Sequence, residues 1–451
     1  MKTIYIQELK CYSKIKLLEL LGHDEKAFEK LLAYAIINKD DELYQFRFIG
    51  VIIIDNLVIN VYPKYIPENK FRKSDFKQVL KVIKKYNSLH YDLDYQNDNL
   101  EDISYNQLSM MIFFIEDYFE NGLYSNIQNV LEVNGNGEID WNRTINYTDP
   151  IIKDNKPYYV ELYTKRKIDD LFDYFRLLHK YIITQCSKKL EKAGLIDLFD
   201  LTPVELSSKN LDDFGEIGII LENIEKELHI QFNTQKIRLL KSMHAYLSEE
   251  NSFSNENYLT VYGTSTYHVI WEDICKKVFR DKLDKKLGEL TLPVPLNEKY
   301  SPHDKLIDII EKPVWHLKEG DFKVDTFRPD LITLWKDYFV IFDAKYYKLK
   351  FTPNLEKQPG LTDVTKQYLY QLAYQDFIDL HKFNGVKNAF LMPTYDNEID
   401  NKGYVEIKIL HDLSLENIQV IMLPANEMNQ LYLDNKKMNV LRLKILKPLN
   451  I

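Results

Sequence analysis

The chain has 451 residues, a length too great for one small core, so two or three domains are expected. Its formal net charge of -9 argues against a broad basic surface for DNA, so any contact with nucleic acid should be local or made through a partner. The three cysteines, Cys11, Cys186 and Cys275, lie far apart. Their spacing predicts neither a disulfide framework nor a zinc site.

Several functional classes are excluded by the absence of their motifs. No G-x-x-x-x-G-K-[ST] loop occurs, so the chain has no phosphate-binding loop for nucleotide hydrolysis. No G-x-S-x-G occurs, which argues against a serine hydrolase. Met1–Lys16 lacks the apolar core of a signal peptide, and the longest apolar runs are too short to cross a bilayer. We therefore expect a cytoplasmic protein that does not enter a membrane.

The N-terminal half predicts strands followed by helices. Residues 43–65 have the pattern of a hairpin, with strands at 44–54 and 57–62, a turn at Asp55-Asn56, and Pro63 ending the second strand. Apolar residues at helical spacing predict helices over 74–85, 104–119, 169–192 and 234–247. The stripe of the third helix comprises Leu171, Phe172, Phe175, Leu178, Ile182 and Ile183. Asn134-Gly-Asn-Gly137 breaks the helical pattern sharply.

The polar segment 249–257 is the best linker candidate, because it is short of apolar residues and separates two patterned regions. We therefore expect an α+β region over 1–250 and a second, mixed α/β domain over 258–451. In the second domain the pattern predicts a helix at 266–279, strands at 331–335 and 338–347, a helix at 365–380, and strands at 388–392 and 404–410. The helix at 365–380 should turn Leu369, Leu372, Ala373 and Phe377 inward.

An acid and a lysine end the most apolar strand. Residues 338–342 are apolar on both faces, which predicts a buried central strand. Asp343-Ala344-Lys345 follows, and the two-residue period of a strand puts Asp343 and Lys345 on one face with Ala344 opposite. Asp330 begins the preceding strand, and a tight turn between the two would lay them side by side. Asp330 and Asp343 should then meet at one edge of the sheet.

Two carboxylates at one sheet edge repel each other unless a cation lies between them. Mg²⁺ (or Mn²⁺) fits this role, because it takes oxygen ligands, keeps several waters and lowers the pKa of one that can act as nucleophile. We expect Asp330 and Asp343 to bind the ion, with the carbonyl of Ala344 as a further ligand. Lys345 would orient the water or stabilise charge on the attacked phosphate. The alternative is a surface lysine that merely pairs with Asp343.

Two further residues are candidates for the same site. Glu272, on the helix at 266–279, could add a third carboxylate, and Gln367 could position substrate or water. The alternatives are a solvated helix position for Glu272 and a surface polar residue for Gln367. In the N-terminal half, Tyr62-Pro63-Lys64-Tyr65 could contact nucleic acid, since aromatic rings stack on bases and lysine meets phosphate. Such a segment is more often a turn at the end of a strand.

These residues resemble a known family. Phe327-Arg-Pro-Asp330 with Asp343-Ala-Lys-Tyr-Tyr347 resembles the PD-(D/E)XK nuclease core of McrC-like restriction subunits, and in particular the LlaJI restriction endonuclease family. The same pattern includes Tyr262-Gly-Thr264 before Trp271-Glu272, Lys366-Gln-Tyr-Leu-Tyr370, Ile49-Gly-Val51 with Asn60-Val-Tyr-Pro-Lys64, and Asn136-Gly-Glu-Ile-Asp-Trp141. The resemblance covers roughly Arg47 to Met392.

The resemblance implies a metal-dependent endonuclease that cleaves double-stranded DNA within a two-part restriction system for anti-phage defence. The other part would be an McrB-like AAA+ GTPase, into whose ring the N-terminal region docks and whose nucleotide hydrolysis it stimulates. By this resemblance Asp330 and Asp343 are metal ligands, Lys345 is catalytic, and Glu272 and Gln367 are accessory residues. Gln371, one helical turn later, is the alternative to Gln367.

Two other interpretations stay open from the sequence. The chain could be a catalytically silent module that only activates a AAA+ partner, although the intact set of two aspartates and a lysine argues against this. It could also be a nuclease that acts alone, on RNA or on DNA ends.

Overall fold

The computed structural model describes residues 1–54, 56–90, 103–252, 259–318, 320–323, 325, 328–351, 355–356, 358–411 and 413–443. The chain divides into two compact units. The first comprises Met1, Ile53–Asn56 and Asn99–Tyr262, and the second comprises Lys2–Ile52, Leu57–Asp98 and Gly263–Ile451. The sequence predicted one region over 1–250. In the structure, Lys2–Ile52 and Leu57–Asp98 belong to the same compact unit as Gly263–Ile451. Of the predicted linker at 249–257, the portion 253–257 lies outside the described residues.

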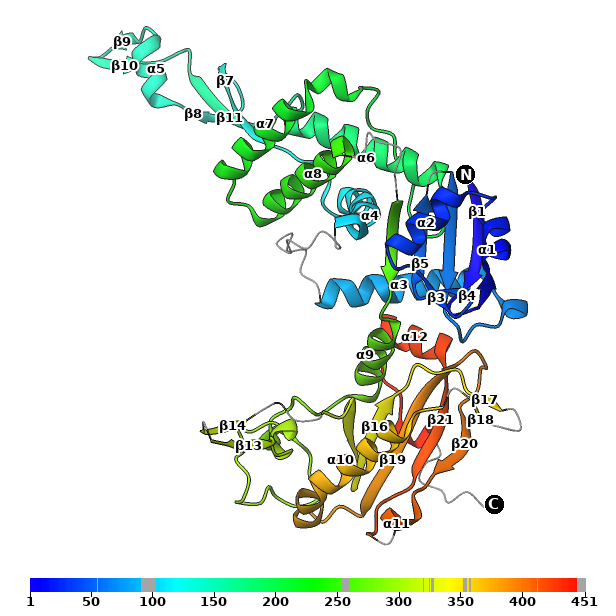
Figure 1. The fold of residues 1–451 in the computed structure, drawn as a ribbon. Helices are drawn as coiled ribbons and strands as arrows, with labels where there is room; N and C mark the ends of the chain where they lie inside the picture. Colours follow the sequence, from blue (N-terminus) through cyan, green and yellow to red (C-terminus); the bar gives the residue numbers. More distant parts are fainter. Residues whose placement is uncertain are drawn as a thin grey trace. The chain divides into compact units, whose positions relative to one another are not determined.

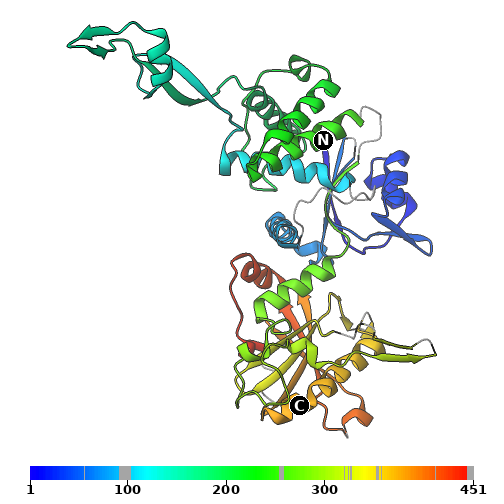
Figure 2. The ribbon, with the colours of Figure 1, turned by 90° about the vertical axis from the view of Figure 1, so that its left-hand side faces the viewer.

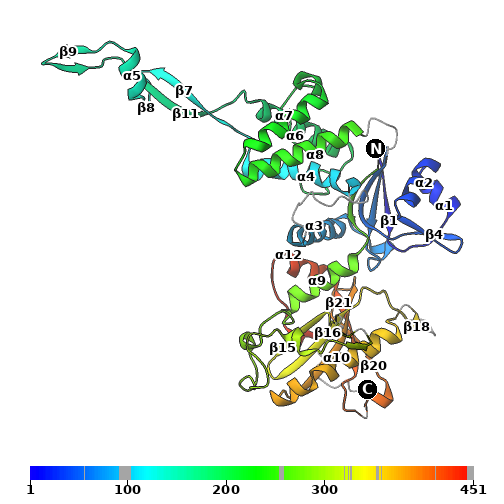
Figure 3. The ribbon, with the colours of Figure 1, turned by 60° about the vertical axis from the view of Figure 1, so that its left-hand side comes forward.

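The first unit combines a helical bundle with a long arm. The helices are α4 (Ile103–Asn121), α6 (Tyr174–Lys192), α7 (Ile217–Ile230) and α8 (Thr234–Ser252). The arm, residues 127–169, contains β7 (Ile127–Val133), β8 (Glu138–Ile139), α5 (Trp141–Tyr147), β9 (Ile151–Lys153), β10 (Lys156–Tyr158) and β11 (Tyr163–Asp169). Strand β11 pairs antiparallel with both β7 and β8, and the arm projects away from the helices of its own unit (Figure 3).

The helix predicted over 169–192 begins later than expected. Asp169 still belongs to strand β11, and α6 begins at Tyr174 because the side chain of Asp173 accepts a hydrogen bond from the backbone N–H of Arg176 and caps the helix. Leu171 and Phe172, assigned to the buried stripe, are exposed in the connection before the helix. The helices predicted at 104–119 and 234–247 are confirmed, and each extends a few residues further.

A small sheet contains the N-terminal strands of the chain. Its neighbouring strands, in order, are β1 (Lys2–Gln7), β6 (Leu57–Tyr62), β5 (Ile49–Ile54) and β12 (Leu259–Thr264). The expected strands at both sides of the turn at 55–56 are thus confirmed as neighbours, while Asp55 itself lies outside the described residues. A second sheet contains β2 (Tyr12–Ser13), β4 (Leu43–Phe46) and β3 (Ile37–Asp40), with α1 (Lys14–Leu20) and α2 (Glu25–Ala33) beside it.

A mixed five-stranded sheet forms the centre of the C-terminal part (Figure 1). Its order is β15 (Leu331–Trp335), β16 (Tyr338–Ala344), β19 (Gly385–Thr394), β21 (Ile418–Pro424) and β20 (Asp400–Val405). Strands β16, β19 and β21 run parallel to one another, and the two edge strands are antiparallel to their neighbours. Strand β16 is buried along nearly its whole length, as its apolar sequence predicted.

Helices cover both faces of this sheet. Phe342 of β16 contacts Phe279 of α9 (Tyr267–Phe279), whereas Phe339 contacts Tyr374 and Phe377 of α10 (Leu361–Leu380). Residues three apart on a strand point to opposite faces, so α9 and α10 lie on opposite sides of the sheet. Helices α3 (Lys73–His90) and α12 (Ala425–Leu433) pack against α9 and against each other (Figure 2). This packing explains why the N-terminal stretches group with the C-terminal part.

Two expectations for this unit are wrong in detail. Leu369 and Leu372 are exposed, while Tyr370, Gln371 and Tyr374 are among the buried residues of α10. The buried face of α10 thus uses tyrosine and glutamine, which an apolar stripe does not reveal. The strand predicted at 404–410 is instead β20, which ends at Val405, followed by the short helix α11 (Lys408–His411). Among the described residues, no helix is long and apolar enough to span a bilayer.

Candidate active site

Two carboxylates meet at one edge of the five-stranded sheet, as the sequence predicted. Leu331 pairs with Phe342 in the antiparallel ladder, so Asp330 immediately precedes β15 and lies opposite Asp343 near the end of β16. The side chain of Asp330 accepts a hydrogen bond of 2.7 Å from the backbone N–H of Ala344. This bond joins the side chain of Asp330 to the backbone of the neighbouring strand, just beyond the last paired residues, Leu331 and Phe342.

Lys345 lies between two acidic side chains. Its Nζ is 2.8 Å from Oδ2 of Asp343 and 3.0 Å from Oδ1 of Asp363. Burial alone would lower the pKa of Lys345, but these two carboxylates outweigh burial and raise its pKa above the ordinary value. Only 18% of the Lys345 side chain is exposed, so the surface-lysine alternative does not describe it.

The two aspartates lie in a poorly solvated place, which disfavours their charged forms. Burial raises the pKa of Asp343, and Lys345 only partly offsets that effect. Burial also raises the pKa of Asp330, and the neighbouring charges of Asp343 and Glu272 raise it further. Oδ2 of Asp343 is buried, and it lies 2.8 Å from the ammonium of Lys345. The site therefore gathers more carboxyl groups than its one lysine ammonium can neutralise.

This charge imbalance suits a divalent cation. Within the described residues no group of three or more Asp, Glu, His or Cys side chains forms a metal-binding cluster. Mg²⁺ is commonly held by one or two carboxylates and keeps several waters. The carboxylate donors present are the oxygens of Asp343 and the oxygen of Asp330 that does not accept the Ala344 N–H. Because N–H and C=O of one strand residue point the same way, the carbonyl of Ala344 faces the side on which Asp330 lies.

Glu272 acts on this site through its charge. It lies on α9 and forms an ion pair with Lys276, one turn later on the same helix. Its carboxylate is nevertheless one of the three causes that raise the pKa of Asp330, which places it near the aspartates. Its role as a further metal ligand stays a prediction, because the ion pair with Lys276 already occupies one of its oxygens.

Gln367 is buried inside the domain rather than exposed at the surface. Its Nε2 donates a hydrogen bond of 2.6 Å to Oδ1 of Asn388 on β19 and one of 3.5 Å to the carbonyl of Ile341 on β16. Gln371 is buried as well, and it accepts a hydrogen bond from the backbone N–H of Glu416. Both glutamines join α10 to neighbouring segments. The predicted role of Gln367 in positioning substrate or water stays a prediction.

Asp363 is the member of the site that the sequence analysis missed. It lies in the first turn of α10, where its Oδ2 accepts a hydrogen bond from the backbone N–H of Gly360 and its Oδ1 pairs with Lys345. The available signal was an acidic residue at the third position of a helix, four residues before Gln367. That signal indicates only a helix start, so the contact with Lys345 is visible only in the tertiary structure.

The segment Tyr62-Pro63-Lys64-Tyr65 lies behind the site. Tyr62 and Tyr65 are buried, and Nζ of Lys64 lies over the ring of Tyr346, 4.1 Å from its centre. Tyr346 directly follows Lys345 and donates a hydrogen bond of 2.6 Å to the buried carboxylate of Glu8. Glu8 also accepts a hydrogen bond from the backbone N–H of Lys64. The segment therefore anchors the strand end that carries Lys345, and the strand-end-turn alternative describes it better than a nucleic-acid contact.

Comparison with known proteins gives the chain its relatives. It is 27% identical over 447 residues to the type II restriction enzyme BsuMI component YdjA of Bacillus subtilis (strain 168), covering 94% of this chain and 88% of that protein.

Two solved structures are distant likenesses, both from Thermococcus gammatolerans. A half-complex of McrB AAA+ hexamers with bound McrC matches with a TM-score of 0.39 at 12% identity, covering 96% of this chain and 100% of that chain. The McrBC complex matches with a TM-score of 0.27 at 12% identity, covering 63% of this chain and 89% of that chain.

The family model of the LlaJI restriction endonuclease matches residues 48–426, which include every residue of the site described above except the anchoring Glu8. Membership implies a restriction-system component with nuclease activity. The chain belongs to the LlaJI restriction endonuclease family.

Proposed function

We propose that this chain is the Mg²⁺-dependent DNA-cleaving subunit of its restriction system, with Asp330, Asp343 and Lys345 at the catalytic centre. The observation that carries the proposal is the meeting of Asp330 and Asp343 at one sheet edge, with the ammonium of Lys345 2.8 Å from Asp343. Residue types and geometry together match the hydrolysis of a phosphodiester.

The side chains have separate roles in this proposal. Asp330, Asp343 and the carbonyl of Ala344 would hold the ion, which when bound supplies positive charge to the attacked phosphate and acidifies water. Lys345 brings a fixed positive charge to the same place, which stabilises negative charge that develops on the phosphate. Asp363 and Asp343 hold the Lys345 ammonium from two sides and restrict its position. Ala344, fixed by Asp330, keeps the strand end in register.

We further propose that the arm of the first unit docks the chain onto an McrB-like AAA+ GTPase. The sequence resemblance named above supports that partner, and the surface of the arm supports the location. Large apolar side chains are exposed along it, namely Val133, Trp141, Ile145, Tyr147, Ile151, Ile152, Tyr158 and Val160. An apolar surface of this extent on a projecting element is typical of a protein-binding site.

The test is cleavage of plasmid DNA with Mg²⁺ by the wild type and by Lys345→Ala, each with and without an McrB-like AAA+ GTPase and GTP. Lys387→Ala is a matched control, because Lys387 is also a strand lysine of this sheet, 21% exposed and ion-paired with Glu416. Lys387 pairs with Val340, three residues before Asp343, and therefore lies about 10 Å from the site along the strand.

Loss of cleavage in Lys345→Ala but not in Lys387→Ala is the expected result. Equal cleavage by all three proteins would show that the wrong residues are named. If the wild type leaves DNA intact while it still stimulates GTP hydrolysis, the silent-activator interpretation replaces this one. A dependence of cleavage on the GTPase would support the two-part system. If cleavage still depends on the GTPase after Trp141 and Tyr147 are changed to serine, docking through the arm is refuted.

A further inference from the structure

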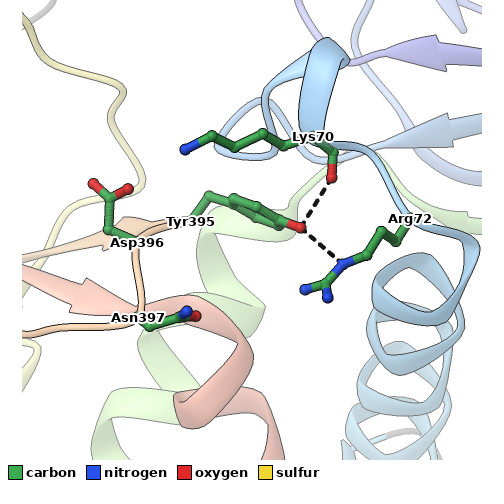
Figure 4. A pocket seen from close by; sticks show the side chains of 5 residues that line it. All are labelled: Lys70, Arg72, Tyr395, Asp396 and Asn397. Atoms are coloured by element: carbon green, nitrogen blue, oxygen red, sulfur yellow. Dashed lines mark hydrogen bonds between the residues drawn. The ribbon is translucent and has the colours of Figure 1, made fainter.

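A pocket of about 370 Å³ lies in the second unit, apart from the residues of the catalytic centre. It is lined by Lys70, Arg72, Tyr395, Asp396 and Asn397 (Figure 4). Lys70 and Arg72 come from the segment between β6 and α3, and the other three residues follow the end of β19. None of the proposed catalytic roles uses these residues.

Arg72 is held in place from one side only. Its Nε is 3.1 Å from Oδ2 of Asp75 and 3.1 Å from the hydroxyl of Tyr395. Asp75 is buried, and the Tyr395 hydroxyl is itself fixed, since it is 2.8 Å from Asp75 Oδ2 and 2.9 Å from the carbonyl of Lys70. The position of the guanidinium plane is therefore set through Nε, without use of the two terminal nitrogens.

The terminal nitrogens of Arg72 are available to a ligand. No hydrogen-bond partner for them is found in the part of the chain that the structure describes, and 64% of the side chain is exposed. In Figure 4 the terminal nitrogens of Arg72 point away from the Tyr395 hydroxyl, whereas the ammonium of Lys70 lies on the other side of the Tyr395 ring. A guanidinium fork with both terminal nitrogens free matches the geometry of a phosphate, which accepts two parallel hydrogen bonds.

The pocket lies at the same edge of the sheet as the catalytic centre. Ala344 pairs with Leu391 on the parallel strand β19, and Tyr395 follows Leu391 by four residues. At about 3.3 Å per residue this is about 13 Å along the strand direction.

The charges that face the pocket include one opposing carboxylate. Asp75 is neutralised by Arg72, whereas Asp396 lines the pocket and accepts a hydrogen bond from the hydroxyl of Thr394. The local charge of Lys70, Arg72, Asp75 and Asp396 is therefore balanced, and an anion would be held by the arginine fork rather than by a general positive field. Asp396 would weaken that binding.

We propose that Arg72 binds a backbone phosphate of the DNA substrate, at a position displaced along the direction of β19 from the phosphate that is cleaved. This inference rests on the proposed function for the identity of the ligand. Phosphate contacts of this kind fix the position of a duplex on a protein without reading its sequence. A contact with Arg72 would thus help to set where the catalytic centre meets the strand.

The test measures binding of a short fluorescein-labelled duplex by fluorescence polarisation in EDTA, so that no cleavage is needed. Arg72→Gln should weaken binding about tenfold and lower the salt dependence by about one ion. Asp396→Asn should tighten binding by about twofold to threefold. Lys299→Gln is the control, since it removes one charge from a side chain that is 59% exposed and ion-paired with Asp376. Lys299 lies near His381 and hence near the start of β19, at the opposite end of the strand.

The outcomes separate this inference from the proposed function. Three results would overturn the inference. Arg72→Gln could bind the duplex as tightly as the wild type, it could lose no more affinity than Lys299→Gln, or the wild type could fail to bind the duplex. Weakened binding by Arg72→Gln in a chain that does not cleave plasmid DNA would support the phosphate contact and count against the nuclease. Normal cleavage by the wild type with unchanged binding by Arg72→Gln would leave the nuclease in place and remove this contact.

Discussion

Replacing Lys345 by methionine should destabilise the second unit, because it leaves a buried negative charge without its partner. Asp343 is 5% exposed, and its Oδ2 is 2.8 Å from the lysine nitrogen. Removing one member of such a pair costs about 3–5 kcal/mol when the other stays charged. Burial already raises the pKa of Asp343, so the carboxyl group can take up a proton instead, which should hold the cost to about 2–3 kcal/mol.

A double-mutant cycle measures this energy directly. Urea unfolding in EDTA would be followed by tryptophan fluorescence, for which the fully buried Trp271 of the same unit is a suitable probe. Asp343→Asn should restore most of the stability lost in Lys345→Met, because the double variant has no buried charge to solvate. Lys387→Met is the control, and its partly exposed pair with Glu416 should contribute about 0–1 kcal/mol.

Two results would contradict this prediction. Lys345→Met could lower the free energy of unfolding no more than Lys387→Met does, or the losses from the substitutions at 343 and 345 could simply add. Either result would mean that water or a proton already neutralises Asp343 in the folded protein. The argument that the site attracts a cation would then lose its physical basis.

Three further predictions concern structural residues. Gly263→Ala should lower the free energy of unfolding of the second unit in urea by about 3 kcal/mol or more. The reason is that the added Cβ would lie 2.1 Å from the carbonyl oxygen of Ile49. A loss below about 0.5 kcal/mol would show that the backbone yields easily. Trp271→Phe removes a buried hydrogen bond of 3.1 Å to the carbonyl of Leu391 and should cost about 1–3 kcal/mol by the same assay, whereas wild-type stability would mean that water replaces the indole. His179→Asn should abolish a pH dependence of the unfolding of the first unit, measured between pH 4 and 8.

The sign of that pH dependence follows from burial. His179 is fully buried, and burial together with the charge of Arg176 lowers its pKa from 6.5 to about 3. Its Nδ1 accepts a hydrogen bond from the backbone N–H of Tyr124, which requires a neutral ring. Between these two pKa values the unfolded chain binds a proton that the folded chain does not. The free energy of unfolding of the wild type should therefore fall by about 1.4 kcal/mol for each pH unit below 6.5. An equal dependence of this free energy on pH in His179→Asn would show that His179 is not its source.

The sequence determined the core of the site because that core depends on neighbours in the chain. An apolar strand followed by Asp343-Ala344-Lys345, and a tight turn after a short strand that Asp330 precedes, leave one simple way to pair the two strands. A strand alternates with a period of two and a hairpin fixes its register, so the positions of Asp330, Asp343 and Lys345 follow from local rules. The helices flanking this sheet were visible for the same reason.

The remaining features depend on contacts between distant parts of the chain. Asp363 is 18 residues from Lys345 and on another element, so only packing of α10 on the sheet brings its carboxylate within 3.0 Å of the lysine. Gln367 gave no sign of burial, because a glutamine is buried only where partners such as Asn388 satisfy its amide. The grouping of the N-terminal stretches with the C-terminal part, the pairing of Glu8 with Tyr346, and the pocket around Arg72 likewise join residues hundreds of positions apart. Periodicity describes which face of an element is apolar, but not which other element covers that face, so only the tertiary structure decided these features.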